Sequence, residues 1–91
     1  MKRYRTVRVD NSIECCEVER ETRDFVVFKS SYGRTKRELK RGYYQRWHET
    51  WAEARAYLMG RAKDRITAAR THLDAAHRDL AQVEAMTEPE P

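Results

Sequence analysis

The sequence predicts an α+β fold, with a small antiparallel β-sheet of three to four strands followed by one long C-terminal α-helix. From Trp51 onward, apolar residues recur every three or four positions, as on one face of a helix. Before that point, β-branched and aromatic side chains alternate with turn-forming clusters, which is typical of short strands. The 91 residues suit a single domain with a modest core. We divide it into a β-meander (1–41), an aromatic connector (42–49), a long helix (50–86) and a disordered tail (87–91).

The strands are expected in the first forty residues. A first strand runs over 4–9 and ends at the turn-prone Asp10-Asn11-Ser12 cluster, and a second covers 13–18. Residues 25–28, Phe-Val-Val-Phe, form the strongest β-run of the chain. Residues 34–40 alternate only weakly, so we expect an edge strand whose charges discourage stray pairing. This order places the sheet first, with the helix laid across one of its faces.

The core is expected between this sheet and the start of the helix. Apolar strand positions, the aromatic residues of the connector and the first apolar helix positions should supply it. The predicted core residues are Val7, Val9, Ile13, Cys15, Phe25, Val27, Tyr44, Trp47, Trp51, Ala54 and Leu58.

The helix has a clear start signal and a long apolar stripe. Thr50 and Glu53 have the spacing of a capping box. A helix over 50–86 would be about 55 Å long, whereas a compact domain of this size has a radius of gyration of about 12 Å. We therefore expect it to overhang its domain and to pair with a second copy, parallel or antiparallel. The alternative is a hairpin bent at Gly60. The residues expected to associate are Ile66, Ala69, Leu73, Ala76, Leu80 and Val83.

Composition limits the classes of protein that fit. Charged residues make up 37% of the chain and the mean hydropathy is −1.00, yet two Trp, five Tyr and two Phe argue against full disorder. No apolar run is long enough to span a bilayer and no signal peptide is evident, so we expect a soluble, intracellular protein without a membrane partner. Cys15 and Cys16 are adjacent, and the three histidines are far from them in sequence. The pattern therefore predicts reduced thiols, one buried and one facing out, with no metal site and no cofactor.

The strongest functional signal is a basic segment. Residues 29–46 carry seven basic side chains against the single acid Glu38, whereas residues 51–91 are nearly balanced. Interleaved tyrosines suit this segment to phosphates and stacked bases, to an acidic protein surface, or simply to solvent. We expect a partner-binding basic patch formed by Lys29, Arg34, Lys36, Arg37, Lys40, Arg41, Tyr43, Tyr44 and Arg46.

Nothing in the sequence indicates an enzyme. The three glycines, at 33, 42 and 60, form no phosphate-binding loop, and no nucleophile has an evident base, so no catalytic residue is predicted. The glutamates at 14, 17, 19 and 21 are expected to form an acidic counter-patch on one solvent face. Such a face is more plausible for recognition than for acid–base chemistry.

The capped Thr50-Trp51-Ala52-Glu53-Ala54 opening, the Ala- and Arg-rich helix and the strand region rich in Arg and Glu resemble small bacteriophage- and prophage-encoded proteins. This resemblance implies a context, the cytoplasm of a host bacterium. It also implies a class of partner, because such proteins often bind and block a host or defence protein, as anti-CRISPR proteins do. The working hypothesis is a non-enzymatic protein-binding module that dimerises through its helix. The alternative is a protein that binds nucleic acid through the basic segment 29–46.

Overall fold

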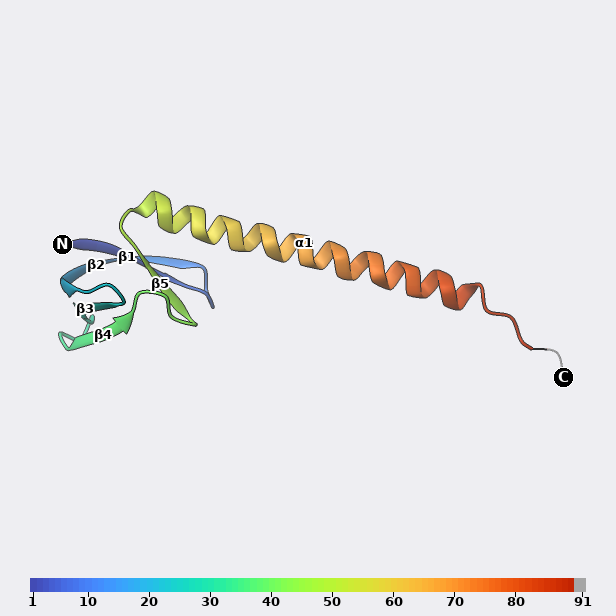
Figure 1. The fold of residues 1–91 in the computed structure, drawn as a ribbon, viewed down its shortest axis with the longest axis horizontal. Helices are drawn as coiled ribbons and strands as arrows, with labels where there is room; N and C mark the ends of the chain where they lie inside the picture. The colour runs from blue at the N-terminus through green and yellow to red at the C-terminus, as the bar shows by residue number, and fades with distance from the viewer. Residues whose placement is uncertain (90–91) are drawn as a thin grey trace. The chain divides into compact units, whose positions relative to one another are not determined.

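The computed structural model describes residues 1–89 and confirms the α+β class, with five strands rather than three to four (Figure 1). It divides into two units, Met1–Gly60 and a second that begins at Arg61, and each is described by itself. The elements are β1 (Lys2–Val7), β2 (Ser12–Glu21), β3 (Phe25–Lys29), β4 (Thr35–Leu39), β5 (Gln45–His48) and α1 (Trp51–Glu84).

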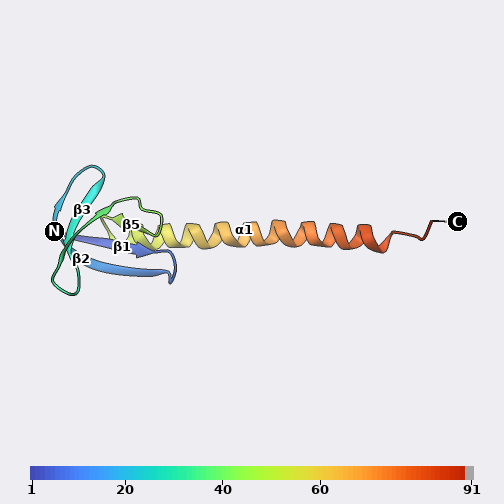
Figure 2. The ribbon, with the colours of Figure 1, turned by 90° about the horizontal axis from the view of Figure 1, so that it is seen from below.

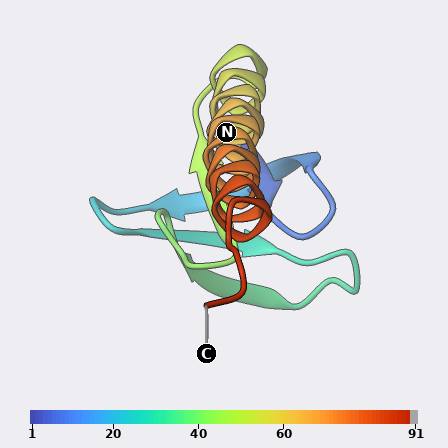
Figure 3. The same ribbon diagram turned by 90° about the vertical axis from the view of Figure 1, so that its right-hand side faces the viewer.

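The five strands form one antiparallel sheet in the order β4-β3-β2-β1-β5. The first four strands follow one another as the predicted meander, and their hairpins are visible in Figure 3. The turn clusters are confirmed: Asn11 (φ 54°) and Gly33 (φ 78°) take the left-handed conformation in the turns after β1 and β3. The fifth strand lies within the predicted aromatic connector and pairs with β1, with Tyr4 opposite His48.

The two edges of this sheet meet at one end. Arg41 and Arg46 form an isolated antiparallel bridge. The backbone N–H of Trp47 donates to the carbonyl of Lys40, and that of Gly42 donates to the carbonyl of Gln45, each at 2.9 Å. Because these bonds join the end of β4 to β5, the sheet is partly closed and the exposed edge is shortened.

The main core lies on one face of the sheet and is smaller than predicted. Its buried apolar residues are Val18, Val26, Phe28 and Trp47, with Cys16 packed against them. The rings of Phe28 and Trp47 are 4.9 Å apart at an interplanar angle of 60°. Trp47 was predicted to be buried, and this is confirmed.

Several core predictions were wrong. The buried side chains of β3 are Val26 and Phe28, whereas Phe25 and Val27 point to the opposite face and are only half-buried. Adjacent strand residues face opposite sides, so choosing the wrong face exchanges the whole set. On β2 the wrong face was likewise predicted to be buried. Cys15 was expected in the core but is exposed, and Cys16 is the half-buried cysteine. Three further expected core residues, Val9, Tyr44 and Trp51, are exposed.

The start of α1 packs on the other face of β1 and β5. Ala54 is fully buried, as predicted, and Thr6 is 1% exposed. Tyr57 lies beside His48, with ring centroids 5.2 Å apart, and Leu58 is half-buried. Among residues 51–60 these are the only side chains that are not exposed, so within the first unit the expectation of a helix laid across the sheet was wrong.

The helix itself is confirmed. Thr50 Oγ1 accepts the N–H of Glu53 at 3.1 Å, as the capping box requires, while the Glu53 carboxylate accepts the N–H of Glu49 rather than that of Thr50. The helix continues through Gly60 without interruption (Figure 2), which rules out the hairpin alternative. It ends at Glu84, two residues before the predicted end. The predicted tail is without regular structure over 87–89, and residues 90–91 lie outside the described part of the chain.

No helix within the described residues is both long enough and apolar enough to span a membrane.

Candidate interaction surfaces

The predicted basic patch does not form one continuous surface. On β4, Arg37 faces the same side as Val27, whereas Lys36 lies opposite Phe28 on the other side. Arg34 belongs to the turn before β4, Lys29 ends β3, and the remaining members are distributed over β5 and the segment before it. The alternation of strand residues therefore divides the charges between two faces and a turn.

Two of the lysines in the patch have ionic partners. Lys29 Nζ lies 3.6 Å from Glu19 Oε1, and Lys40 Nζ lies 3.8 Å from Glu21 Oε2. Glu21 also pairs with Arg3 at 3.3 Å. Glu38 is the single acid within residues 29–46, but the fold brings two acids from β2 beside lysines of this segment, which the count along the sequence could not show.

Two of the arginines lie over aromatic rings. The guanidinium carbon of Arg37 is 3.7 Å from the centroid of Phe25, on the exposed side of β3 and β4. That of Arg46 is 4.7 Å from the centroid of Tyr57, at the start of α1. Such cation–π contacts orient the side chains without neutralising them. Arg46 serves to attach the helix to β5, and its Nε is buried without a hydrogen-bond partner in the described residues.

Three further patch residues, Arg41, Tyr43 and Tyr44, lie in the loop between β4 and β5 of the first unit, which we call the β-unit, and a residue that sequence reasoning missed contacts this loop. We call this surface the aromatic tip and define it as Arg8, Arg41, Tyr43 and Tyr44. The two tyrosines are 74% and 63% exposed, and their rings meet edge to face with centroids 4.7 Å apart. The guanidinium carbon of Arg8 lies 5.2 Å from the centroid of Tyr43.

The tip is held in place by bonds between two turns. Arg8 donates its backbone N–H to the carbonyl of Tyr44 at 2.9 Å, and its Nη1 donates to the carbonyl of Tyr43 at 2.9 Å. The Gly42–Gln45 backbone bond closes the same loop from the other side. The exposed aromatic rings are thus presented on a fixed backbone. No local pattern predicts the contribution of Arg8, because 35 residues separate it from Tyr43.

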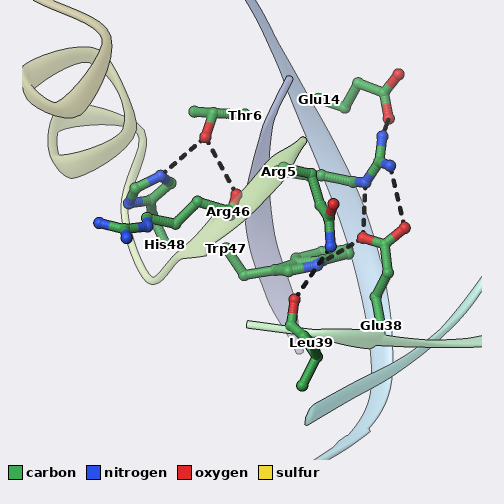
Figure 4. Close-up of polar contacts among 9 residues, drawn as sticks. Arg5, Thr6, Glu14, Glu38, Leu39, Arg46, Trp47 and His48 are labelled. Carbon is green, nitrogen blue, oxygen red and sulfur yellow. Dashed lines mark hydrogen bonds and ion pairs between the residues drawn. The ribbon is translucent and has the colours of Figure 1, made fainter. Parts of the chain in front are cut away.

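Beside the tip, a polar network joins three strands (Figure 4). Glu38 on β4 accepts hydrogen bonds from Arg5 on β1, at 2.9 and 3.0 Å, and from the indole N–H of Trp47 on β5, at 2.9 Å. The hydrogen bond to Glu38 is the main reason that the pKa of Arg5 is raised above its ordinary value. The only acid of the basic segment is therefore committed to the fold.

A second polar cluster lies on the opposite face of β1. The hydroxyl of Thr6 donates to the carbonyl of Arg46 at 3.2 Å and lies 3.1 Å from Nε2 of His48 (Figure 4). The hydroxyl thus lies within hydrogen-bonding distance of both groups, and the tautomer of His48 decides which of Thr6 and His48 donates in their contact. Burial lowers the pKa of His48 below its ordinary value, and the positive charge of Arg46 lowers it further.

The acidic residues of β2 do not form the expected counter-patch. Glu14 lies 3.7 Å from Arg5, Glu17 lies 2.8 Å from the amino group of Met1, and Glu19 and Glu21 have the partners given above. Each carboxylate is thus compensated by a cation on a neighbouring strand. This face is a set of cross-strand ion pairs rather than a free acidic surface.

An open groove of about 970 Å³ lies on the surface of the β-unit. Its lining is mostly charged and includes Arg3, Glu21, Lys40, Trp47 and Glu53. Three of these residues form the Arg3–Glu21–Lys40 ion pairs, so their charges already have partners. Within residues 1–89, no group of three His, Cys, Asp or Glu side chains is arranged to hold a metal ion. Burial raises the pKa of Cys16, which keeps that thiol protonated.

The predicted self-association residues form an exposed seam on α1. Ile66, Leu73, Leu80 and Val83 are 53–59% exposed. Ala69 and Ala76 lie between them, and both are exposed. None of the six ion pairs within residues 1–89 involves a side chain of α1. Both the apolar stripe and the charges beside it are therefore available to another molecule.

A scan against models of known protein families, a search of curated proteins and a search of solved structures each returned no match for this chain. The chemistry of its surfaces is thus what supports a function.

Proposed function

We propose that this chain is a non-enzymatic protein-binding module that holds a partner protein through the aromatic tip and self-associates through α1. The observation that carries the proposal is the pair of exposed tyrosines, Tyr43 and Tyr44, fixed edge to face beside Arg8. Tyrosine and arginine are enriched among the residues that dominate binding energy at protein interfaces.

The rigidity of the tip supports this function. Binding costs free energy whenever side chains or loops must be ordered, and a surface that is already ordered avoids part of that cost. Arg8 holds the backbone at both tyrosines through hydrogen bonds of 2.9 Å. Two adjacent exposed aromatic rings on a fixed backbone are the kind of surface at which partner proteins bind.

The partner is proposed to be a host or defence protein with an acidic surface, the class implied by the resemblance to small phage proteins. Arg8 and Arg41 supply two positive charges at the tip, and neither is among the ion pairs of the described residues. Charge complementarity of this kind accelerates encounter and selects among partners.

The alternative function, nucleic-acid binding, rests on a different element. Tyr32 is 90% exposed in the turn between β3 and β4, two residues before Arg34 and four residues before Lys36 on β4. An exposed aromatic ring beside cations is suited to stacking a base and contacting phosphate. The division of the remaining basic residues between two faces is less favourable, because a nucleic-acid backbone needs a continuous positive track.

Affinity capture from a bacterial host lysate tests the proposal, with the wild-type chain compared with Tyr43→Ser/Tyr44→Ser. The matched control is Tyr32→Ser, which removes a tyrosine outside the tip that is more exposed than either of the two. We expect a protein to be retained by the wild type and by the control, unchanged by nuclease, and lost from the double variant. Retention that disappears with nuclease or with Tyr32→Ser, and falls steeply with salt, would favour nucleic acid instead.

A further inference from the structure

This inference rests on the self-association in the proposed function. That function leaves open which molecule covers the seam of α1, and whether the two paired helices run parallel or antiparallel. We propose that the occupant is a second copy of this chain, paired antiparallel over residues 63–84 with Leu73 of one copy facing Ala76 of the other. The register follows from three observations on α1, namely the heptad spacing, the alternation of large and small residues, and the separation of charge along the helix.

The spacing is that of a two-stranded coiled coil. From Ile66 to Val83 the apolar residues are separated alternately by three and four positions. In this repeat Ile66, Leu73 and Leu80 occupy the first core position of each heptad, and Ala69, Ala76 and Val83 occupy the second. All six residues are exposed in the single chain.

Side-chain size favours antiparallel packing. In an antiparallel pair, the first core position of one helix faces the second core position of the other. Leu73 then faces Ala76, Leu80 faces Ala69, and Ile66 faces Val83. Each large leucine meets an alanine, which allows the helices to approach closely and fill the space between them. A parallel pair would instead place Ala69 against Ala69 and Ala76 against Ala76, which leaves two core layers underfilled.

The distribution of charge along α1 also favours antiparallel packing. Residues 61–70 carry four basic side chains and one acid, whereas residues 74–88 carry four acids and one basic side chain. Two copies aligned antiparallel bring the basic part of each helix beside the acidic part of the other. In the proposed register Lys63 lies beside Glu84 of the second copy, and His72 lies beside Asp79.

The parallel arrangement has the opposite result. In a parallel coiled coil, a residue that flanks the core of one helix meets the residue five positions later in the other helix. Arg65 would face Arg70 of the second copy, His72 would face His77, and Asp79 would face Glu84. All three contacts join residues of the same kind, and two of them join like charges at neutral pH. Like charges at these positions destabilise a coiled coil and select against that orientation.

The positions of the charged residues also distinguish one antiparallel register from another. A shift by one heptad would keep apolar residues in every core layer, with Ile66 against Ala76 and Leu73 against Ala69. That shift would, however, bring Arg70 beside Arg70 of the second copy, and His72 beside His72. The proposed register avoids both contacts, so electrostatic complementarity selects it.

Disulfide trapping tests the orientation and the register together. The full chain is prepared with Cys15→Ser and Cys16→Ser, so that no native thiol interferes, and Ile66→Cys or Val83→Cys is then added separately. In the proposed pair, positions 66 and 83 of different copies are adjacent. The two positions 66 are separated by 17 residues along the axis, which is about 25 Å and too far for a disulfide.

We therefore expect neither cysteine variant to crosslink alone under a redox buffer, and an equimolar mixture to form the 66–83 heterodimer. Adding Leu73→Asp to both variants should abolish that product, which separates a specific pair from random collision. The circular dichroism of each variant confirms that α1 is retained.

Crosslinking of each variant with itself would show a parallel pair and overturn the proposal. The absence of any crosslink, with α1 retained, would overturn the proposed register, and sedimentation of the same chains would then show whether a second copy covers the seam at all. Because Tyr43→Ser and Tyr44→Ser lie outside the seam, they should leave the heterodimer unchanged. A failure of self-association is thereby distinguished from a failure of partner binding at the tip.

Discussion

Glu38 and Trp47 join the two edge strands of the sheet through a side-chain hydrogen bond of 2.9 Å between the indole N–H and Oε1. The same carboxylate accepts both Nε and Nη2 of Arg5. Every other charged residue of the segment 29–46 is basic, so the sequence alone makes Glu38 look like an isolated acid in a cationic surface. In the structure it links β1, β4 and β5 where the sheet closes.

Replacing Glu38 with Ala should therefore destabilise the β-unit by about 2 kcal/mol, because a half-buried guanidinium and a buried indole N–H lose their acceptor. Chemical denaturation followed by Trp fluorescence measures this change. The control is Glu14→Ala, which removes a more exposed carboxylate 3.7 Å from the same arginine and should cost less than about 0.5 kcal/mol. Equal losses in the two variants would show that Glu38 has no special role.

The His48 cluster predicts a dependence of stability on pH. Burial and Arg46 lower the pKa of His48 in the folded chain below its ordinary value of 6.5. The unfolded chain therefore takes up a proton at a higher pH than the folded chain does. The stability contributed by neutral His48 is fully present above about pH 6.5 and is lost as pH falls through the lower, folded pKa.

Thermal unfolding of the wild type and of His48→Gln, measured between neutral and mildly acidic pH, isolates this effect. The difference in stability between the two chains should shrink as pH falls, because glutamine does not titrate. NMR titration of the His48 ring protons gives the pKa directly. A midpoint at or above that of an ordinary histidine would contradict the assignment.

Gly60 offers a stabilising substitution. It lies within α1, and a Cβ built at this position has no heavy atom within 4 Å outside its own helix. Glycine costs about 1 kcal/mol relative to alanine in a helix interior, so Gly60→Ala should stabilise the helix by up to about that amount. Amide hydrogen exchange across residues 56–64 measures the gain. Faster exchange in the variant would mean that the helix is interrupted here in solution.

The parts of the fold that sequence predicted best are those with local causes. The helix start at Thr50 and Glu53 depends on residues three apart, and the helix period depends on neighbours three and four apart. The turns around Asn11 and Gly33 likewise depend on residues within the turn. Each of these signals is complete within a short stretch of chain.

The parts that sequence missed depend on distant contacts. The strand β5 consists of Gln-Arg-Trp-His, which has no alternating apolar pattern, and it exists because it pairs with β1 some forty residues earlier. The burial of Val26 and Phe28, rather than Phe25 and Val27, depends on which face of β3 meets Trp47. No pattern within Phe-Val-Val-Phe distinguishes the two faces.

The candidate surfaces divide in the same way. All residues of the exposed seam on α1 could be predicted from the helical spacing of apolar residues in the sequence. The aromatic tip could be predicted only in part, because Tyr43 and Tyr44 were named within the basic segment whereas Arg8 reaches them from another hairpin. The division of the basic residues between two faces required the register of β3 and β4.

Antiparallel pairing of two copies through oppositely charged parts of α1 is the central claim, and sedimentation of charge-reversed chains tests it most directly. One variant carries Lys63→Glu and Arg70→Glu, and the other carries Asp79→Lys and Glu84→Lys. We expect each variant alone to dimerise at least about tenfold more weakly than the wild type, a cost of about 1.4 kcal/mol, because position 63 then carries the same charge as position 84 of the second copy. An equimolar mixture should recover a dimer at wild-type affinity. If the Lys63→Glu/Arg70→Glu chain instead dimerises more tightly than the wild type, as a parallel pair with Arg65 facing Glu at position 70 requires, the antiparallel account is wrong.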